Sequence, residues 1–151
     1  MARKIGPKAA DLIKSFEGLR LKAYPDPATG GDPWTVGYGH TGSDVRPGMT
    51  INREQADALF DRDIAKFEAA VEKAIGSAPT NAAQFGALVS FAYNVGAGNL
   101  NSSTLLRKHK AGDFKGAQAE FARWNRAAGK VMAGLTRRRK AEADLYGLYG
   151  L

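Results

Sequence analysis

The chain has no cysteine, only two histidines and no long hydrophobic run. Without cysteine, the fold rests on no disulfide and the protein has no thiolate nucleophile or sulfur ligand for a metal. Two histidines are too few for a histidine-based site, so we expect no metal. Residues 5–14 lack the apolar core of a signal peptide, and no later run approaches the length of a membrane span. We therefore expect synthesis in the cytoplasm and no stable membrane association.

The 151 residues are 44% apolar, which is enough for one domain with a sizeable core. Their formal charge of +7 implies attraction to a polyanion, which is a nucleic acid, an anionic cell wall or a membrane surface. Residues 137–139 are three consecutive arginines near an expected helix start, as in some nucleic-acid-binding proteins. Lysine and arginine are otherwise scattered, and no zinc-finger, RNA-recognition or Walker signature occurs. We therefore expect no nucleic-acid partner.

The first third of the chain predicts one helix followed by short strands. Pro7 suits a first helical turn, apolar residues then recur at helical spacing, and Gly18 offers a left-handed stop just after Glu17. Residues 21–38 change to short β-like pieces. The proline- and glycine-rich residues 25–33 interrupt them and predict a long, turn-rich loop.

The rest of the chain predicts helices. Apolar residues from Leu59 to Ile75 trace one face of a long helix that Gly76 ends. The caps expected for the helices that follow are Thr80 or Asn81, Ser102 or Ser103, Asp113 for a helix over 114–124, and Thr136 for the last helix, after a loop at 129–134.

These patterns predict an α+β fold of a single domain, residues 1–151. A small β-containing lobe of about residues 15–60 is joined by the long helix to a larger helical lobe. The helical lobe comprises about residues 77–151 and the N-terminal helix. A cleft is expected between the two lobes.

Three residues near the N-terminus have the chemistry for cutting a glycosidic bond. Such cleavage needs a carboxylic acid that protonates the leaving oxygen and a second carboxylate that handles water or the developing positive charge. Glu17 lies between Phe16 and Gly18, where an apolar neighbour and an open approach favour the acid role. Asp26 lies between two prolines, and the hydroxyl of Thr35 is placed to orient a water beside it. Taken singly, each also fits an ordinary surface, turn or strand residue.

Several sequence blocks point in the same direction. Residues 17–24 read EGLRLKAY, Asp26 follows, and residues 34–41 read WTVGYGHT. FAYNVG at 91–96 and an arginine-rich segment after Gly134 and Leu135 come later. In this order, over nearly the whole chain, the blocks resemble the phage-type lysozymes, or endolysins, of glycoside hydrolase family 24, which includes the lysozymes of T-even phages.

The resemblance implies a lysozyme-like fold and a set of roles. Glu17 would be the general acid, while Asp26 and Thr35 would position the water that attacks the sugar from the opposite face, with inversion. The bond would be the β-1,4 linkage between N-acetylmuramic acid and N-acetylglucosamine in bacterial peptidoglycan. One departure is that eight residues separate Asp26 from Thr35, more than in many members of the family. Residues 27–33 therefore resemble an insertion beside the catalytic turn.

Other positions match supporting residues of the family. Contact with the sugar chain is implied for Thr41, Tyr93, Asn94 and Thr104. His40 matches a structural histidine that pairs with an aspartate at the start of the long helix, for which Asp63 is the best candidate; a catalytic histidine is the less favoured alternative. Arg137 or Arg138 would reach Glu17.

As an endolysin, the protein would accumulate in the host cytoplasm and depend on a holin to permeabilise the membrane. It would then act on peptidoglycan in the periplasm, as a monomer without a cofactor. Three alternatives stay open: a wall-binding module that has lost catalysis, a nucleic-acid-binding protein, and an enzyme with side activity on chitin.

Overall fold

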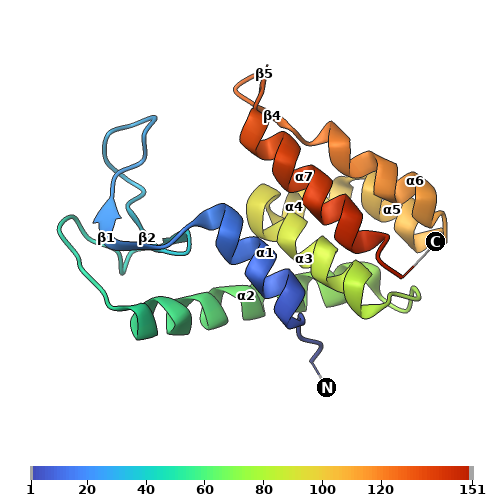
Figure 1. Ribbon diagram of the computed structural model, residues 1–151, viewed down its shortest axis with the longest axis horizontal. Helices are drawn as coiled ribbons and strands as arrows, with labels where there is room; N and C mark the ends of the chain where they lie inside the picture. Colours follow the sequence, from blue (N-terminus) through green and yellow to red (C-terminus); the bar gives the residue numbers. More distant parts are fainter. Residues whose placement is uncertain (1, 150–151) are drawn as a thin grey trace. The chain divides into compact units, whose positions relative to one another are not determined.

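The computed structural model of the protein describes residues 2–149, and most of its helices and strands are labelled in Figure 1. In chain order they are α1 (Pro7–Glu17), β1 (Arg20–Tyr24), β2 (Thr35–Gly37), β3 (His40–Thr41), α2 (Arg53–Ile75), α3 (Ala82–Val95), α4 (Ala97–Ser102), α5 (Thr104–Lys110), α6 (Phe114–Glu120), a 3-10 turn (Phe121–Arg123), β4 (Arg126–Ala127), β5 (Lys130–Val131) and α7 (Ala133–Tyr146). Within residues 2–149, no helix has both the length and the apolar composition needed to cross a membrane.

The chain divides into two compact units. The strand unit is Ile13–Lys66, and the helical unit is Met1–Leu12 together with Phe67–Leu151. Both boundaries fall inside helices, one in α1 and the other in α2. The strand unit is one continuous stretch of sequence, and it separates the two segments of the helical unit.

The strand unit contains a three-stranded antiparallel sheet in the order β1-β2-β3. Thr35 of β2 lies opposite Tyr24 of β1 on one side and Thr41 of β3 on the other. The free edge of β1 is paired with residues 49–51 by two backbone hydrogen bonds, each of 2.8 Å. The strands expected between residues 21 and 38 are present. β1 is an inner strand, because it lies between β2 and residues 49–51.

One face of this sheet packs on a small apolar core. Its buried members are Ala23, Val36, Val45, Ile51 and Ala56. Half-buried side chains, among them Trp34 and Tyr38, close the core at its rim. The first turns of α2 supply Ala56, so the sheet and this helix share the same core.

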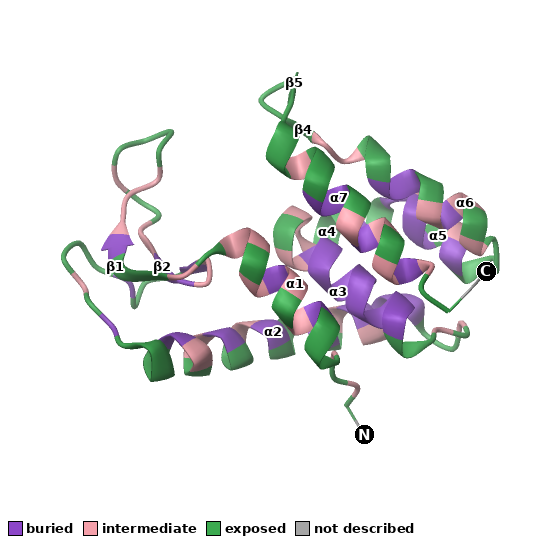
Figure 2. Cartoon of the chain, in the orientation of Figure 1, coloured by how far each residue is buried: buried purple, intermediate pink, exposed green. Residues whose placement is uncertain are grey.

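In the helical unit, α3 occupies the centre. All residues from 83 to 92 are buried, and Figure 2 shows this helix as almost wholly purple. A helix that is apolar on every side has to be enclosed by others, and α3 packs against α7 and α4. Asn81, rather than Thr80, caps α3: its side chain accepts from the Gln84 N–H, and the Gln84 side chain accepts from the Asn81 N–H.

Several helix boundaries differ from the expectation. Ser103, rather than Ser102, caps α5, and Asp113 caps α6 as expected. The helix expected over 114–124 ends at Glu120 and tightens into a 3-10 turn. The short helix α4 was not anticipated, because two glycines in residues 96–98 suggest a loop.

The prediction that Thr136 caps the last helix is wrong. The helix α7 begins at Ala133, and the Thr136 hydroxyl donates back to the carbonyl of Met132 within its first turn. Part of the loop expected at 129–134 forms the hairpin β4–β5, whose turn places Ala128 at φ 51° and Gly129 at φ 78°.

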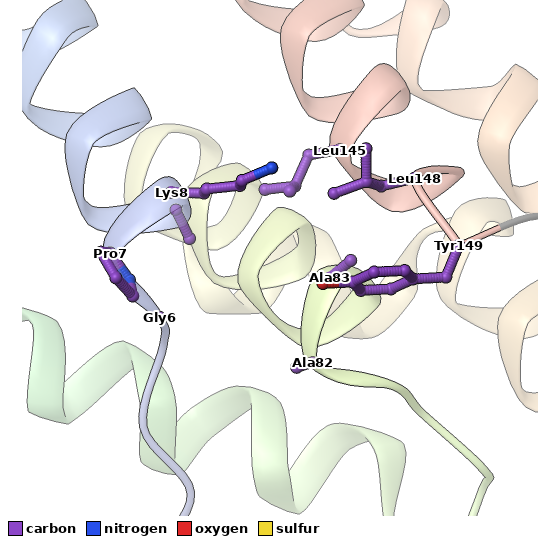
Figure 3. A pocket seen from close by; sticks show the side chains of 9 residues that line it. Gly6, Pro7, Lys8, Ala82, Ala83, Leu145, Leu148 and Tyr149 are labelled. Atoms are coloured by element: carbon purple, nitrogen blue, oxygen red, sulfur yellow. The ribbon is translucent and has the colours of Figure 1, made fainter.

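The start of α1 meets the start of α3 and the end of α7 around a small apolar pocket. Its volume is about 250 Å³, and its lining includes Ala9, Ala83, Leu145 and Tyr149 (Figure 3). Beside the pocket, α1 and α3 approach so closely that a Cβ on Gly86 would lie 2.7 Å from the Cβ of Ala9. Glycine at position 86 therefore sets the distance between these two helices.

Gly86→Ala is expected to lower the free energy of unfolding by about 1–3 kcal/mol, because the new methyl group overpacks the contact with Ala9. Gly98→Ala is the matched control, since Gly98 is an exposed residue of α4 with no atom within 4 Å of an added Cβ. The control should be neutral or slightly stabilising. Urea unfolding measures both, and equal losses for the two variants would contradict this account of the packing.

A buried histidine links α5 to α7. The His109 Nδ1 atom faces the Tyr146 hydroxyl, and its Nε2 atom lies 2.8 Å from Oγ1 of Thr80. The Thr80 hydroxyl donates its one proton to the carbonyl of Ala78 at 2.9 Å, so it accepts from Nε2–H, and Nδ1 accepts from Tyr146. This network suits the neutral ring, and burial lowers the pKa of His109.

The stability of the protein is expected to fall as the pH is lowered from 7 to 5. The unfolded chain binds a proton at His109 with a pKa of about 6.5, whereas the folded chain binds it only at lower pH, so unfolding takes up a proton in this window. The His109→Gln variant should lose this part of the pH dependence in urea unfolding followed at several pH values.

Asp44 titrates outside this window, because the hydrogen bond with His40 holds its pKa below the ordinary value of 3.8. Burial raises the pKa of Glu142, and this contributes with the opposite sign, so the comparison with His109→Gln decides. The same pH dependence of stability in the two chains between pH 7 and 5 would show that His109 is not held neutral.

Candidate functional site

Glu17 is the last residue of α1. The helix ends there because Gly18 takes a left-handed conformation, with φ 73°, and its N–H bonds to the Lys14 carbonyl at 2.9 Å. The Glu17 side chain is half-buried and rests against the backbone of Gly39, where an added Cβ would lie 2.5 Å from Oε1. The absence of a side chain at Gly39 is therefore what lets this carboxylate occupy its place.

Asp26 sits at the start of the long loop between β1 and β2, which folds back on itself. The Asp26 N–H donates to the carbonyl of Gly31 at 2.9 Å, and its own carbonyl accepts from the Gly30 N–H at 2.7 Å. One carboxylate oxygen, Oδ1, accepts from the Ala28 N–H at 2.8 Å, an Asx turn. The extra residues thus form a closed loop that holds Asp26, and its second carboxylate oxygen accepts no bond from this turn.

Thr35 opens β2, and Asp26 lies two residues beyond its cross-strand partner Tyr24. Asp26 and Thr35 are therefore at the same end of the β1–β2 pair. Thr41, also predicted to contact substrate, is exposed on the other side of Thr35, in β3. The strand unit thus brings a carboxylate and two threonine hydroxyls to one end of its sheet.

His40 is buried between two carboxylates. Its Nδ1 lies 2.7 Å from Oδ2 of Asp63, the predicted partner, and its Nε2 lies 3.0 Å from Oδ2 of Asp44. Both ring nitrogens face acceptors, so neither is left to take a proton from a substrate. The prediction that the aspartate stands at the start of the long helix is wrong, because Asp63 lies ten residues after Arg53, where α2 begins.

Asp44 was missed in the sequence. It follows His40 by four residues in a glycine- and serine-containing turn, and no periodic pattern marks such a contact. The same limitation applies to Gly39, whose role depends on a side chain more than twenty residues earlier in the chain.

Two predicted residues lie in the last turn of α3, in the helical unit. Tyr93 packs its ring on Phe67, with centroids 5.1 Å apart. Asn94 is exposed and lines a pocket of about 380 Å³ together with Trp124 and Arg126. The Trp124 ring meets Phe91 edge-on at 5.3 Å, which holds it in place beside the pocket. Trp124 and Arg126 were not predicted, because they follow a 3-10 turn that the sequence presents as the end of a helix.

The two candidate arginines of α7 have different environments. Arg137 is exposed, whereas Arg138 is buried, with its Nε 3.3 Å from Oε2 of Glu142 and its Nη2 3.3 Å from the carbonyl of Ser90. Glu142 is itself fully buried and also accepts from the Ser90 hydroxyl at 2.6 Å. Of the two, Arg138 is the one whose position is fixed by its surroundings.

Thr104 is half-buried at the start of α5 and lines neither the pocket beside Asn94 nor a second one next to α5. Across residues 2–149, no three side chains of histidine, aspartate or glutamate gather into a group that would hold a metal ion.

Comparison with known proteins assigns this arrangement to a family. The sequence profile described as phage lysozyme matches residues 14–142, which include the sheet, α2, α3 and most of α7. The chain belongs to the phage lysozyme family.

Its relatives in the phage lysozyme family support the assignment. The endolysin of Bacillus phage B103 is 49% identical over 142 residues, covering 94% of this chain and 53% of that protein. The endolysin from Escherichia coli O157:H7 phage FAHEc1 has 41% identity and a TM-score of 0.86, over 97% of this chain and 94% of that one. The muramidase domain of SpmX from Asticcacaulis excentricus has 37% identity and a TM-score of 0.86, over 95% and 97%.

The structural neighbours confirm the expected lysozyme-like α+β fold. The chain spans about half the length of the Bacillus phage endolysins that it matches.

Asp63→Asn is expected to lower the free energy of unfolding by about 1–3 kcal/mol, because it weakens a charge-assisted hydrogen bond to a buried ring. Asp61→Asn is the control, since Asp61 is exposed on the same helix and forms no ion pair. Chemical unfolding compares the two, and a stable Asp63→Asn variant that loses only its activity would favour the catalytic alternative for His40.

Proposed function

We propose that the protein is a lysozyme that hydrolyses the β-1,4 bond between N-acetylmuramic acid and N-acetylglucosamine in bacterial peptidoglycan. The observation that carries the proposal is the fixed placement of Glu17 against Gly39, in a chain of the phage lysozyme family. Relatives named endolysin and muramidase domain support the same activity.

In this reaction, Glu17 donates its proton to the glycosidic oxygen as the bond breaks. The carboxylate lies where a side chain of residue 39 would otherwise be, so glycine at this position leaves the space that Glu17 occupies. The Glu17 side chain is half-buried beside the backbone of Gly39.

Asp26 and Thr35 position the water. The Asx turn occupies Oδ1 of Asp26, and the second oxygen of the carboxylate takes the proton of the water, while the Thr35 hydroxyl orients that water. Attack from the face opposite the leaving oxygen inverts the anomeric centre. The hydrogen bonds of Asp26 to residues of the loop 27–33 then keep its carboxylate in place.

The pocket beside Asn94 is proposed to receive the sugar chain. An indole ring such as that of Trp124 offers an apolar face to a sugar, and the Asn94 amide has donors and an acceptor for an acetamido group. Arg126, in the same lining, suits the carboxylate of a muramic acid substituent. Tyr93, Thr41 and Thr104 remain proposed substrate contacts, and Arg138 rather than Arg137 is the arginine proposed to act with Glu17.

In an infected cell, the proposed role is lysis of the host. Synthesis in the cytoplasm, release by a holin and action as a monomer on periplasmic peptidoglycan belong to the same proposal.

Glu17→Gln is expected to lower the rate of wall cleavage by about a thousandfold or more, because it keeps the shape of the side chain and removes the donated proton. Mass spectrometry of the fragments released from purified peptidoglycan measures the loss. The wild-type protein should yield fragments ending in reducing N-acetylmuramic acid, as the α-anomer when NMR spectra are taken before mutarotation.

Glu54→Gln is the matched control, because Glu54 is an exposed glutamate of the same unit, and it should keep full activity. Substantial cleavage by Glu17→Gln would overturn the assignment of the acid. Anhydro ends would identify a lytic transglycosylase, and a wild-type protein that binds walls without cutting them would be a binding module.

A further inference from the structure

The net positive charge of the chain belongs to one of its two units. The strand unit has seven lysines and arginines against eight aspartates and glutamates, and the helical unit has fifteen against seven. Residues 107–140 alone hold eleven lysines and arginines and only two acidic residues. The attraction to polyanions inferred from a charge of +7 therefore belongs to the helical unit, mainly to the segment from α5 to the start of α7.

Within that segment, Arg107 and Lys110 on α5 are exposed, and neither positive charge has a carboxylate partner among the described residues. They are three residues apart, so they lie on the same side of the helix and repel each other. Lys108, between them in sequence, differs, since it lies 3.8 Å from a Glu120 oxygen that Arg123 also contacts at 3.1 Å. Such a pair of cations without an acid attracts anions.

The two cations line a pocket. Its volume is about 380 Å³, and its lining is Asn101, Ser102, Ser103, Leu106, Arg107 and Lys110. The Ser103 hydroxyl is already used in capping α5, because it donates to Leu100 and accepts from the Leu106 N–H. The Asn101 side chain is exposed and, among the described residues, makes no hydrogen bond. The side chains that remain for a ligand include the Asn101 amide, which can donate or accept, and the two cations, which only donate.

This basic pocket, as we call it, is separate from the pocket beside Asn94. The short helix α4 contributes Asn99 to one and Asn101 to the other. Two residues along an α-helix correspond to a turn of about 200°, so the two side chains leave α4 on opposite sides. An anion in the basic pocket is therefore not part of the sugar that the Asn94 pocket would hold.

We propose that the basic pocket binds the carboxylates of peptide stems on a second wall strand. The inference rests on the proposed function, because stem carboxylates are the charged groups of peptidoglycan. Arginine and lysine pair well with carboxylates, and the pocket has room for more than one such group. Since the wall is a network, the enzyme would be held on it by one strand while another is cut.

The proposal is tested by wall binding in a background that does not cut. In a Glu17→Gln chain, Arg107→Gln and Lys110→Gln are combined, and sedimentation with purified peptidoglycan measures the dissociation constant at low and high salt. We expect binding about tenfold weaker at low salt, the combined effect of two exposed ion contacts, and little difference at high salt. Glu17→Gln chains with and without the two pocket substitutions should bind equally to peptidoglycan whose carboxyl groups have been converted to amides.

The matched control is the pair Lys115→Gln and Lys130→Gln, two exposed lysines of the same unit, which removes the same charge outside the pocket. Binding should be nearly unchanged in this control. An equal loss in both pairs would overturn the proposal in favour of a general charge effect, and so would a loss that persists on amidated walls. Unchanged wall binding with weakened binding of a phosphate polymer such as DNA would also overturn it, in favour of a phosphate site.

The proposal for the basic pocket and the proposed function are tested by different measurements, so either can be refuted alone. Cleavage by the chain without these substitutions tests the enzyme, whereas the binding measurement needs no cleavage. A chain that cuts walls and binds them independently of Arg107 and Lys110 would refute the pocket alone. A chain that never cuts walls but binds them through the pocket would refute the proposed function alone.

Discussion

The contact between the Glu17 carboxylate and the backbone of Gly39 is the constraint on which the proposed chemistry depends. It requires a helix that stops at residue 17, which Gly18 provides, and a strand connection without a side chain at residue 39. It also requires the turn between β2 and β3 to be held still. The pairing of His40 with Asp63 and Asp44 does this directly after Gly39, and it agrees with the structural role that we expect for His40.

Much of the fold follows from patterns in the sequence. Helical periodicity and glycine stops place α1, α3 and the end of α2 to within a few residues, because these elements bury one whole face or more. The start of α2 is not placed, because the helix begins at Arg53, well before the first apolar residue of the pattern, Leu59. The proposed site residues Glu17, Asp26 and Thr35 are predicted from their chemistry and from the resemblance to a family. The His40–Asp63 pair is also anticipated, although its place within α2 is not.

What escapes prediction depends on contacts between residues that are distant in sequence or on short elements. The hairpin β4–β5 and the early start of α7 are set by pairing across a glycine turn, and helix propensity does not indicate them. Trp124 and Arg126 reach the Asn94 pocket only because α3 and the 3-10 turn converge on Phe91. The separation of charge between the two units is present in the composition, but it becomes visible only when the unit boundaries are known.

The most direct test of the central claim, that Gly39 leaves Glu17 free to act as the acid, compares Gly39→Ala with Gly37→Ala. Both glycines have positive φ values, 79° and 68°, so alanine strains the backbone in both variants. Only at Gly39 would the methyl group collide with the Glu17 carboxylate, because at Gly37 its nearest atoms are 3.7 Å away. We expect kcat to fall far more for Gly39→Ala than for Gly37→Ala at a similar loss of stability. Equal effects on kcat would contradict the claim.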